Sequence, residues 1–216
     1  ADPAGGSPLS LTRFWRHVLF LRPDIFIMYD ELSVDRQGAL FTWLLHSYVR
    51  MQVDEERRLV TIPADNAVLE VRFLLPGSLP SESDGQRLRF ELTDQFAVPL
   101  DSVVLDDPDN KPDQWHLRVT TTNPRQVEHF LTVLQVNRPH PEGAQVLPVG
   151  MLPAEGGFAL WLPSRRILVL GRADGASAVK ATVPGGVPVE AEGQLAAVEF
   201  DDATGSAGVP QIGHWL

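Results

Sequence analysis

Two side chains in the first quarter of the chain have the types and the spacing needed for proton transfer. His46 and Tyr48 lie two residues apart in an apolar, β-prone stretch, and residues i and i+2 of a strand share one face. On such a face a neutral histidine can act as a base and a tyrosine as an acid. The alternative is that both lie at the rim of the core, each with one hydrogen bond. His46 and Tyr48 are therefore the candidate catalytic pair, with both interpretations open.

A second group of residues suits the binding of a sugar. Arg13 and Trp15 share one strand face, with His17 beyond them. An aromatic ring beside guanidinium groups can stack on an anionic sugar while the cation holds its carboxylate. The alternative, which the frequent burial of aromatic residues favours, places Trp15 in the core and pairs the arginines with Asp24 or Asp30. Arg13, Trp15 and His17 are the candidate ligand-binding residues, and this alternative stays open.

The sequence shows no recognisable metal, nucleophile or phosphate site. None of the six histidines forms an i,i+2 or i,i+4 pair with another, so no local chelate is visible. Residues 106–110 are rich in carboxylates but lack the glycine and the terminal glutamate of an EF-hand, and a solvated acidic turn is the favoured interpretation. Cysteine is absent, and neither a Gly-x-Ser-x-Gly elbow nor a phosphate loop occurs. We expect this chain to bind no metal and no cofactor.

Composition and charge narrow the classes of partner. The 216 residues include 18 Lys and Arg against 28 Asp and Glu, a formal net charge of −10. Such a field disfavours nucleic acid and anionic membranes, and it disfavours anionic polysaccharides unless basic residues gather locally. Charged residues or prolines interrupt every apolar run before it reaches membrane-spanning length. Residues 1–8 lack the basic start and apolar centre of a signal peptide, and we expect a flexible leader over residues 1–12.

Strand patterns recur at short intervals, whereas helix patterns are almost missing. The 18 prolines and 17 glycines leave few places for a long helix. A turn at residues 22–24 joins the first two strands, and Asp30 and Glu31 are expected to close the second strand. The expected strands are residues 13–21, 25–32, 39–49, 57–62, 67–75, 87–92, 114–121, 127–136, 144–151, 157–162, 167–171, 178–183, 195–200 and 211–216.

Serial short strands joined by tight turns predict an all-β fold, because they favour packed antiparallel sheets over an α/β layer. We expect a large antiparallel β-sandwich, supersandwich-like. A small additional sheet at the C-terminus stays open as an alternative. Residues 13–138 would form the main sandwich and residues 139–216 a terminal β-layer packed on it, within one domain overall. In the last third, Phe158, Leu160 and Leu162 are expected to oppose Leu168 and Leu170 in a hairpin.

The opening segment also resembles a known family. Residues 16–32 read Arg-His-Val-Leu-Phe-Leu-Arg-Pro-Asp-Ile-Phe-Ile-Met-Tyr-Asp-Glu-Leu, and residues 41–46 read Phe-Thr-Trp-Leu-Leu-His. Together they are similar to the C-terminal β-sandwich domain of heparinase II/III-like polysaccharide lyases. Residues 128–134 (Glu-His-Phe-Leu-Thr-Val-Leu) look like a late strand of the same domain. The resemblance covers mainly residues 13–46.

The resemblance implies a function and a set of partners. In that family an α/α toroid is joined to a large β-sandwich, and uronate-containing glycans are cleaved by β-elimination, with Tyr and His commonly serving as acid and base. It implies an acidic polysaccharide and a helical toroid domain, of the same or a partner chain, as partners, and a periplasmic or secreted location. The toroid and the upstream metal-binding motif have no counterpart in this sequence, so no catalytic residue and no divalent metal is carried over.

The expected function is therefore that of a lyase β-domain. It would brace a helical catalytic domain that is absent from this chain and help to wall a cleft for an acidic glycan, and the chain alone would not be catalytic. Two alternatives stay open, a free-standing carbohydrate-binding module and a structural β-domain that oligomerises through an exposed sheet edge. No nucleic-acid partner and no membrane partner is expected.

Overall fold

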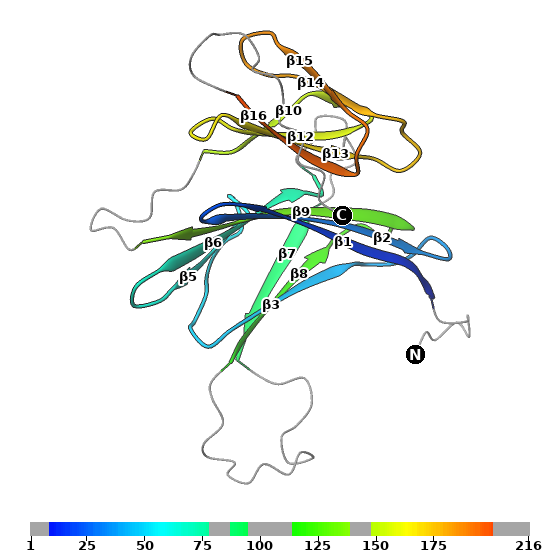
Figure 1. Cartoon of the computed structure of the whole chain (residues 1–216). Helices are drawn as coiled ribbons and strands as arrows, with labels where there is room; N and C mark the ends of the chain where they lie inside the picture. The colour runs from blue at the N-terminus through cyan, green and yellow to red at the C-terminus, as the bar shows by residue number, and fades with distance from the viewer. Residues whose placement is uncertain (1–8, 78–86, 95–113, 139–147, 201–216) are drawn as a thin grey trace. The chain divides into compact units, whose positions relative to one another are not determined.

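The protein is built from strands and turns. The computed structural model describes residues 9–77, 87–94, 114–138 and 148–200, which form sixteen strands and no helix (Figure 1). All pairings are antiparallel, so the prediction of an all-β fold is confirmed. The chain divides into two compact units, Ala1–Gln145 and Val146–Leu216. The described residues contain no apolar helix long enough to cross a membrane.

The first unit contains a six-stranded sheet whose order differs from the chain order. Strand β9 lies between β2 and β6, so the sheet is completed by a segment far along the sequence (Figure 1). Strands β1 and β4 form the two edges. The strands in spatial order are β1 (Leu11–Leu21), β2 (Ile25–Val34), β9 (Val127–Asn137), β6 (Val68–Leu75), β5 (Leu59–Pro63) and β4 (Gln52–Asp54).

A three-stranded sheet packs on one face of this sheet and makes the unit a β-sandwich. Its strands in spatial order are β3 (Thr42–Ser47), β8 (Trp115–Thr121) and β7 (Leu88–Thr93). Buried side chains from both sheets share one core, as expected for two sheets packed face to face. The core includes Val34, Phe41, Trp43, Met51, Val60, Val71, Phe73, Phe90, Leu117, Val119 and Phe130.

The predicted opening hairpin is present, and its second strand is longer than expected. Pairing runs from Leu21 opposite Ile25 to Leu11 opposite Val34, and the strand β1 begins two residues before the predicted residue 13. Asp30 and Glu31 do not close β2 but lie inside it, each 1% exposed. The prediction that these carboxylates end the strand is wrong. They can be buried because basic side chains of β1 contact both.

The second unit contains two small sheets around their own core. The four-stranded sheet has the order β10 (Gly150–Leu152), β12 (Gly157–Leu162), β13 (Ile167–Arg172) and β16 (Leu195–Glu199). The three-stranded sheet has the order β11 (Ala154–Glu155), β14 (Val179–Thr182) and β15 (Pro188–Ala191). The core contains Ala159, Leu168, Leu170, Val179, Ala181, Val183, Val198 and Phe200.

The predicted late hairpin exists, but the expected side-chain opposition is wrong. Leu160 pairs with Val169, and Leu168 pairs with Trp161, so Leu160 and Leu168 lie on opposite faces of the sheet. A shift of one residue in the pairing of two strands moves every side chain of one strand to the opposite face of the sheet. Both faces of this hairpin are apolar, so the alternation of residue types did not fix the register.

Three strands escaped prediction, and some predictions lie outside the described residues. Strands β4 and β11 are only three and two residues long, and β15 begins at Pro188, which cannot donate to a sheet ladder. The expected strand at residues 211–216, the acidic turn at 106–110 and most of the predicted 1–12 leader fall outside the part of the chain that the structure describes.

Candidate functional site

One face of the hairpin β1–β2 brings polar side chains of three strands together. Odd-numbered residues of β1 and β2 point away from the sandwich core, because Met28, Leu32 and Val34 of the even set pack into that core. The register sets Trp15 opposite Glu31 and His17 opposite Tyr29, and Glu31 is also opposite His129 of β9. We call Arg13, Trp15, His17, Tyr29, Glu31 and His129 the β1 face cluster.

Glu31 is the anchor of the β1 face cluster. Its carboxylate is 1% exposed, with Oε1 2.9 Å from Nε2 of His17 and Oε2 3.8 Å from Nη1 of Arg13. A buried carboxylate is costly unless partners are held against it. Glu31 therefore fixes the directions of Arg13 and His17, whose side chains remain partly exposed at 30% and 26%.

Trp15 lies at the surface of this cluster. Its side chain is 53% exposed, and the guanidinium carbon of Arg13 lies 4.5 Å from the centre of its ring. The alternative that placed Trp15 in the core is wrong, because β1 is an edge strand with a neighbouring strand on one side only. The same alternative paired an arginine with Asp30, and this part is confirmed, since Arg16 donates two hydrogen bonds to Asp30 at 2.6 and 2.8 Å.

Tyr29 and His129 form the buried floor of the cluster. The Tyr29 ring stacks between His17, at 6.0 Å, and His129, at 5.7 Å between ring centres. Burial, reinforced by the charge of Glu31, raises the pKa of Tyr29 well above its ordinary value. Burial lowers the pKa of His129, with Arg13 and Arg125 acting in the same direction and Glu31 opposing them. At neutral pH the tyrosine is protonated and the histidine is neutral.

The β1 face cluster is better suited to binding a glycan than to catalysing a reaction on it. Tyr29 and Glu31 are 3% and 1% exposed, so neither can reach a glycan chain. Trp15 offers an open ring, and Arg13 offers guanidinium donors held beside that ring. Sequence reasoning missed the roles of Tyr29, Glu31 and His129. The i,i+2 spacing of Tyr29 and Glu31 in the sequence indicates that they share a strand face. The position of His129 beside them depends on the non-local pairing of β2 with β9, which no local pattern predicts.

The candidate catalytic pair lies elsewhere on the first unit. His46 is on the outward face of the three-stranded sheet, because Trp43 and Leu45 of the same strand pack into the core. Tyr48 follows the end of β3 and is 71% exposed. His46 meets His116 across the strand pair, with ring centres 4.6 Å apart. The β1 face cluster and His46 are thus on opposite outer faces of the sandwich and do not form one site.

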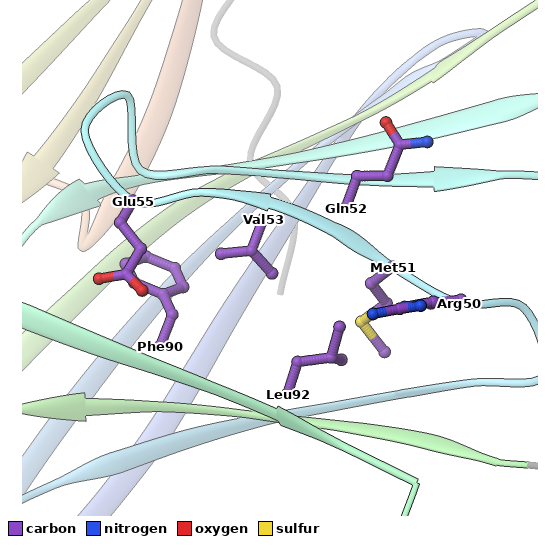
Figure 2. A pocket seen from close by; sticks show the side chains of 7 residues that line it. All are labelled: Arg50, Met51, Gln52, Val53, Glu55, Phe90 and Leu92. Atoms are coloured by element: carbon purple, nitrogen blue, oxygen red, sulfur yellow. The ribbon is translucent and has the colours of Figure 1, made fainter.

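A pocket of about 560 Å³ opens between two edge strands of the sandwich (Figure 2). Residues of β7 line one wall, and β4 with its flanking residues lines the other. None of the residues singled out from the sequence contributes to it. The lining residues are Arg50, Met51, Gln52, Val53, Glu55, Phe90 and Leu92.

Within the described ranges, no group of three or more His, Asp or Glu side chains is arranged to hold a metal ion. Comparison of the sequence with models of known families and with curated proteins finds no match.

Proposed function

We propose that this chain is the C-terminal β-domain of a heparinase II/III-like polysaccharide lyase, and that the Arg13–Trp15 pair contacts an acidic glycan. The observation that carries the proposal is the exposed Trp15 ring with Arg13 stacked on it. This pair lies in the hairpin whose sequence resembles the lyase family. The all-β architecture supports the same assignment, since the family joins a β-sandwich to a helical catalytic toroid.

The chemistry of the pair matches a uronate residue. The ring of a tryptophan can stack on the apolar C–H face of a pyranose, and a guanidinium group donates two hydrogen bonds to a carboxylate. Strand β1 has Arg13, Arg16 and His17 and no acid, in a chain of net charge −10. Asp30 pairs with Arg16 on one face of the hairpin, and Glu31 contacts Arg13 and His17 on the other, so the two carboxylates offset these charges. Binding would therefore depend on stacking and directed hydrogen bonds more than on a positive field.

The test is glycan binding with a matched aromatic control. Trp15→Ala should weaken binding to heparin, hyaluronan or alginate by about tenfold, which corresponds to about 1.4 kcal/mol, in isothermal titration calorimetry. Phe14→Ala is the control, because Phe14 is 54% exposed on the same strand but points to the other face. Equal losses in the two variants, or no glycan binding by the wild-type chain, would contradict the proposal.

The proposal also predicts catalytic silence of the isolated chain. The buried Tyr29 and the separated His46 offer no acid–base pair beside Trp15. No unsaturated-uronate absorbance should appear when the purified chain is incubated with these glycans. Activity that disappears in His46→Ala and Tyr48→Phe would instead establish that pair as catalytic. Full affinity without any contribution from a helical partner would favour a free-standing carbohydrate-binding module.

A second candidate function, assembly through a sheet edge, is favoured by one specific observation. Strand β1 is an edge strand of eleven residues and exposes Leu11, Phe14, Val18 and Phe20. Long apolar edges pair with other strands unless charges protect them. This function predicts a mass that rises with concentration in light scattering and returns to that of a monomer in Val18→Lys, with no affinity for glycans.

A further inference from the structure

The pocket between the two edge strands has the form of a slot with an apolar floor. Met51 and Val53 extend from the β4 side, and Phe90 and Leu92 extend from β7 toward them (Figure 2). Met51 and Phe90 are almost fully buried, and the other two are half-buried. Ligand pockets of 300–1,000 Å³ with an apolar lining and a few polar groups are typical of small-molecule sites, and about 560 Å³ lies in this range.

The two ends of the slot carry opposite charges. Arg50 precedes β4 at one end, where its guanidinium carbon lies 4.9 Å from the centre of the Trp115 ring. Glu55 is at the other end, in the turn after β4, where the backbone N–H of Arg58 donates to the carbonyl of Glu55 at 3.2 Å. Figure 2 shows Arg50 and Glu55 on opposite sides of the apolar floor. Within the part of the chain that the structure describes, neither side chain has an ion-pair partner.

We propose that this slot binds an elongated carboxylic acid that has a flat apolar body and a hydroxyl group at its far end. The carboxylate would accept hydrogen bonds from Arg50, the body would lie on the half-buried Val53 and Leu92, and the hydroxyl would donate to Glu55. A hydroxycinnamic acid has this chemistry. The ion pair with Arg50 at one end and the hydrogen bond to Glu55 at the other set the orientation of the ligand.

This site is separate from the one proposed for glycans. Its lining residues come from β4, β7 and their flanks, whereas Arg13 and Trp15 are on β1 at the opposite edge of the six-stranded sheet. Binding in the slot does not depend on the proposed function. Trp15→Ala should therefore leave it unchanged, and the failure of either proposal can be recognised without the other.

The test is calorimetric titration of the full chain with 4-hydroxycinnamate. Arg50→Gln should weaken its binding by about tenfold or more, because a charged hydrogen-bond donor is lost, and should weaken the binding of the uncharged 4-hydroxycinnamamide clearly less. Glu55→Gln should weaken the binding of 4-hydroxycinnamate but not that of cinnamate, which lacks the hydroxyl. Arg57→Gln is the matched control, because Arg57 is an exposed cation in the same turn that does not line the slot.

Three outcomes would overturn the proposal. The first is the absence of saturable binding to the wild-type chain, and the second is an equal loss of affinity in Arg57→Gln and Arg50→Gln. The third is binding that survives Val53→Trp, which should fill the slot, in a variant whose amide spectrum shows that it is folded. Loss of binding in Val53→Trp, with Arg57→Gln unaffected, is the expected result.

Discussion

Glu31 shows how one buried carboxylate can order a whole surface. It holds Arg13 and His17 from the adjacent strand, and its charge also acts on the pKa values of Tyr29 and His129. A charged residue at the end of an apolar run usually marks a turn, which is why sequence reasoning placed Glu31 at the close of its strand. The basic residues that permit its burial could be read from the sequence only after the register of β1 against β2 was known.

The first prediction concerns this carboxylate. Glu31→Gln should lower the free energy of unfolding by about 2 kcal/mol, because it leaves Arg13 and His17 without the charge that pairs with them in the fold. Urea denaturation measures the change. Asp54→Asn is the control, since Asp54 pairs with Arg57 at an exposed site, and exposed pairs contribute at most about 1 kcal/mol. A smaller effect at Glu31 than at Asp54 would show that the cluster is not anchored in this way.

The second prediction concerns His129 and acid. Its pKa in the folded protein lies below that of the unfolded chain, which is about 6.5. Protonation therefore favours the unfolded state, and the stabilising neutral form is lost as the pH falls below about 6.5.

The corresponding measurement is the free energy of unfolding at a series of pH values from 7 down to 5.5. In His129→Gln, which is neutral throughout, the decline should be shallower than in the wild type. A wild-type slope that His129→Gln does not change would refute this role of burial.

At the scale of strands, local patterns predicted the hairpins and failed where strands are short or both faces are apolar. The opening hairpin was found almost to the residue because Pro23 separates two apolar runs. Strand β4 contains a single apolar residue, Val53, and no alternation can be recognised in three residues. The slot between β4 and β7 therefore could not be predicted from the sequence. One of its walls, β4, was not recognised as a strand, and the other, β7, is distant in the chain.

The third prediction concerns the hairpin β12–β13. A side chain at Gly171 would put its Cβ atom 2.0 Å from the ring of Phe158, which is buried. Gly171→Ala should lower the free energy of unfolding by about 3 kcal/mol through overpacking, measured by urea denaturation. Gly150→Ala, where no atom lies within 4 Å of the new Cβ, should be almost neutral. The second change Phe158→Leu should rescue Gly171→Ala, and a failure to do so would show that the ring is not the obstacle.

At the scale of the whole molecule, the composition predicted the fold class, but the order of strands was not predicted. Proline, glycine and alternating apolar residues indicate strands wherever they occur. The insertion of β9 between β2 and β6 pairs it with residues of β2 about a hundred positions away, and no local signal specifies such a partner. The same insertion explains why the β1 face cluster could be predicted on β1 but not completed from β9.

The fourth prediction follows from that order. A chain that ends at residue 126 lacks β9, which carries four consecutive buried residues, Phe130–Val133, at the centre of the six-stranded sheet. Without β9, β2 and β6 have no common neighbour, and the truncated chain should give the narrow amide dispersion of an unfolded protein in a nitrogen–proton NMR spectrum. The full chain is the control. Well-dispersed amide signals from the truncated chain would show that the sheet can close without its central strand.

The late arrival of β9 also has a consequence inside the cell. During synthesis β2 leaves the ribosome about 100 residues ahead of the strand that will lie beside it, a delay of roughly 5 to 20 seconds at ordinary translation rates. During that interval the backbone groups of β2 that will pair with β9 have no partner, and the side chains of Ile25, Ile27 and Tyr29 are not yet buried. Chaperone supply and growth temperature should therefore govern the soluble yield of this protein more strongly than its final stability does.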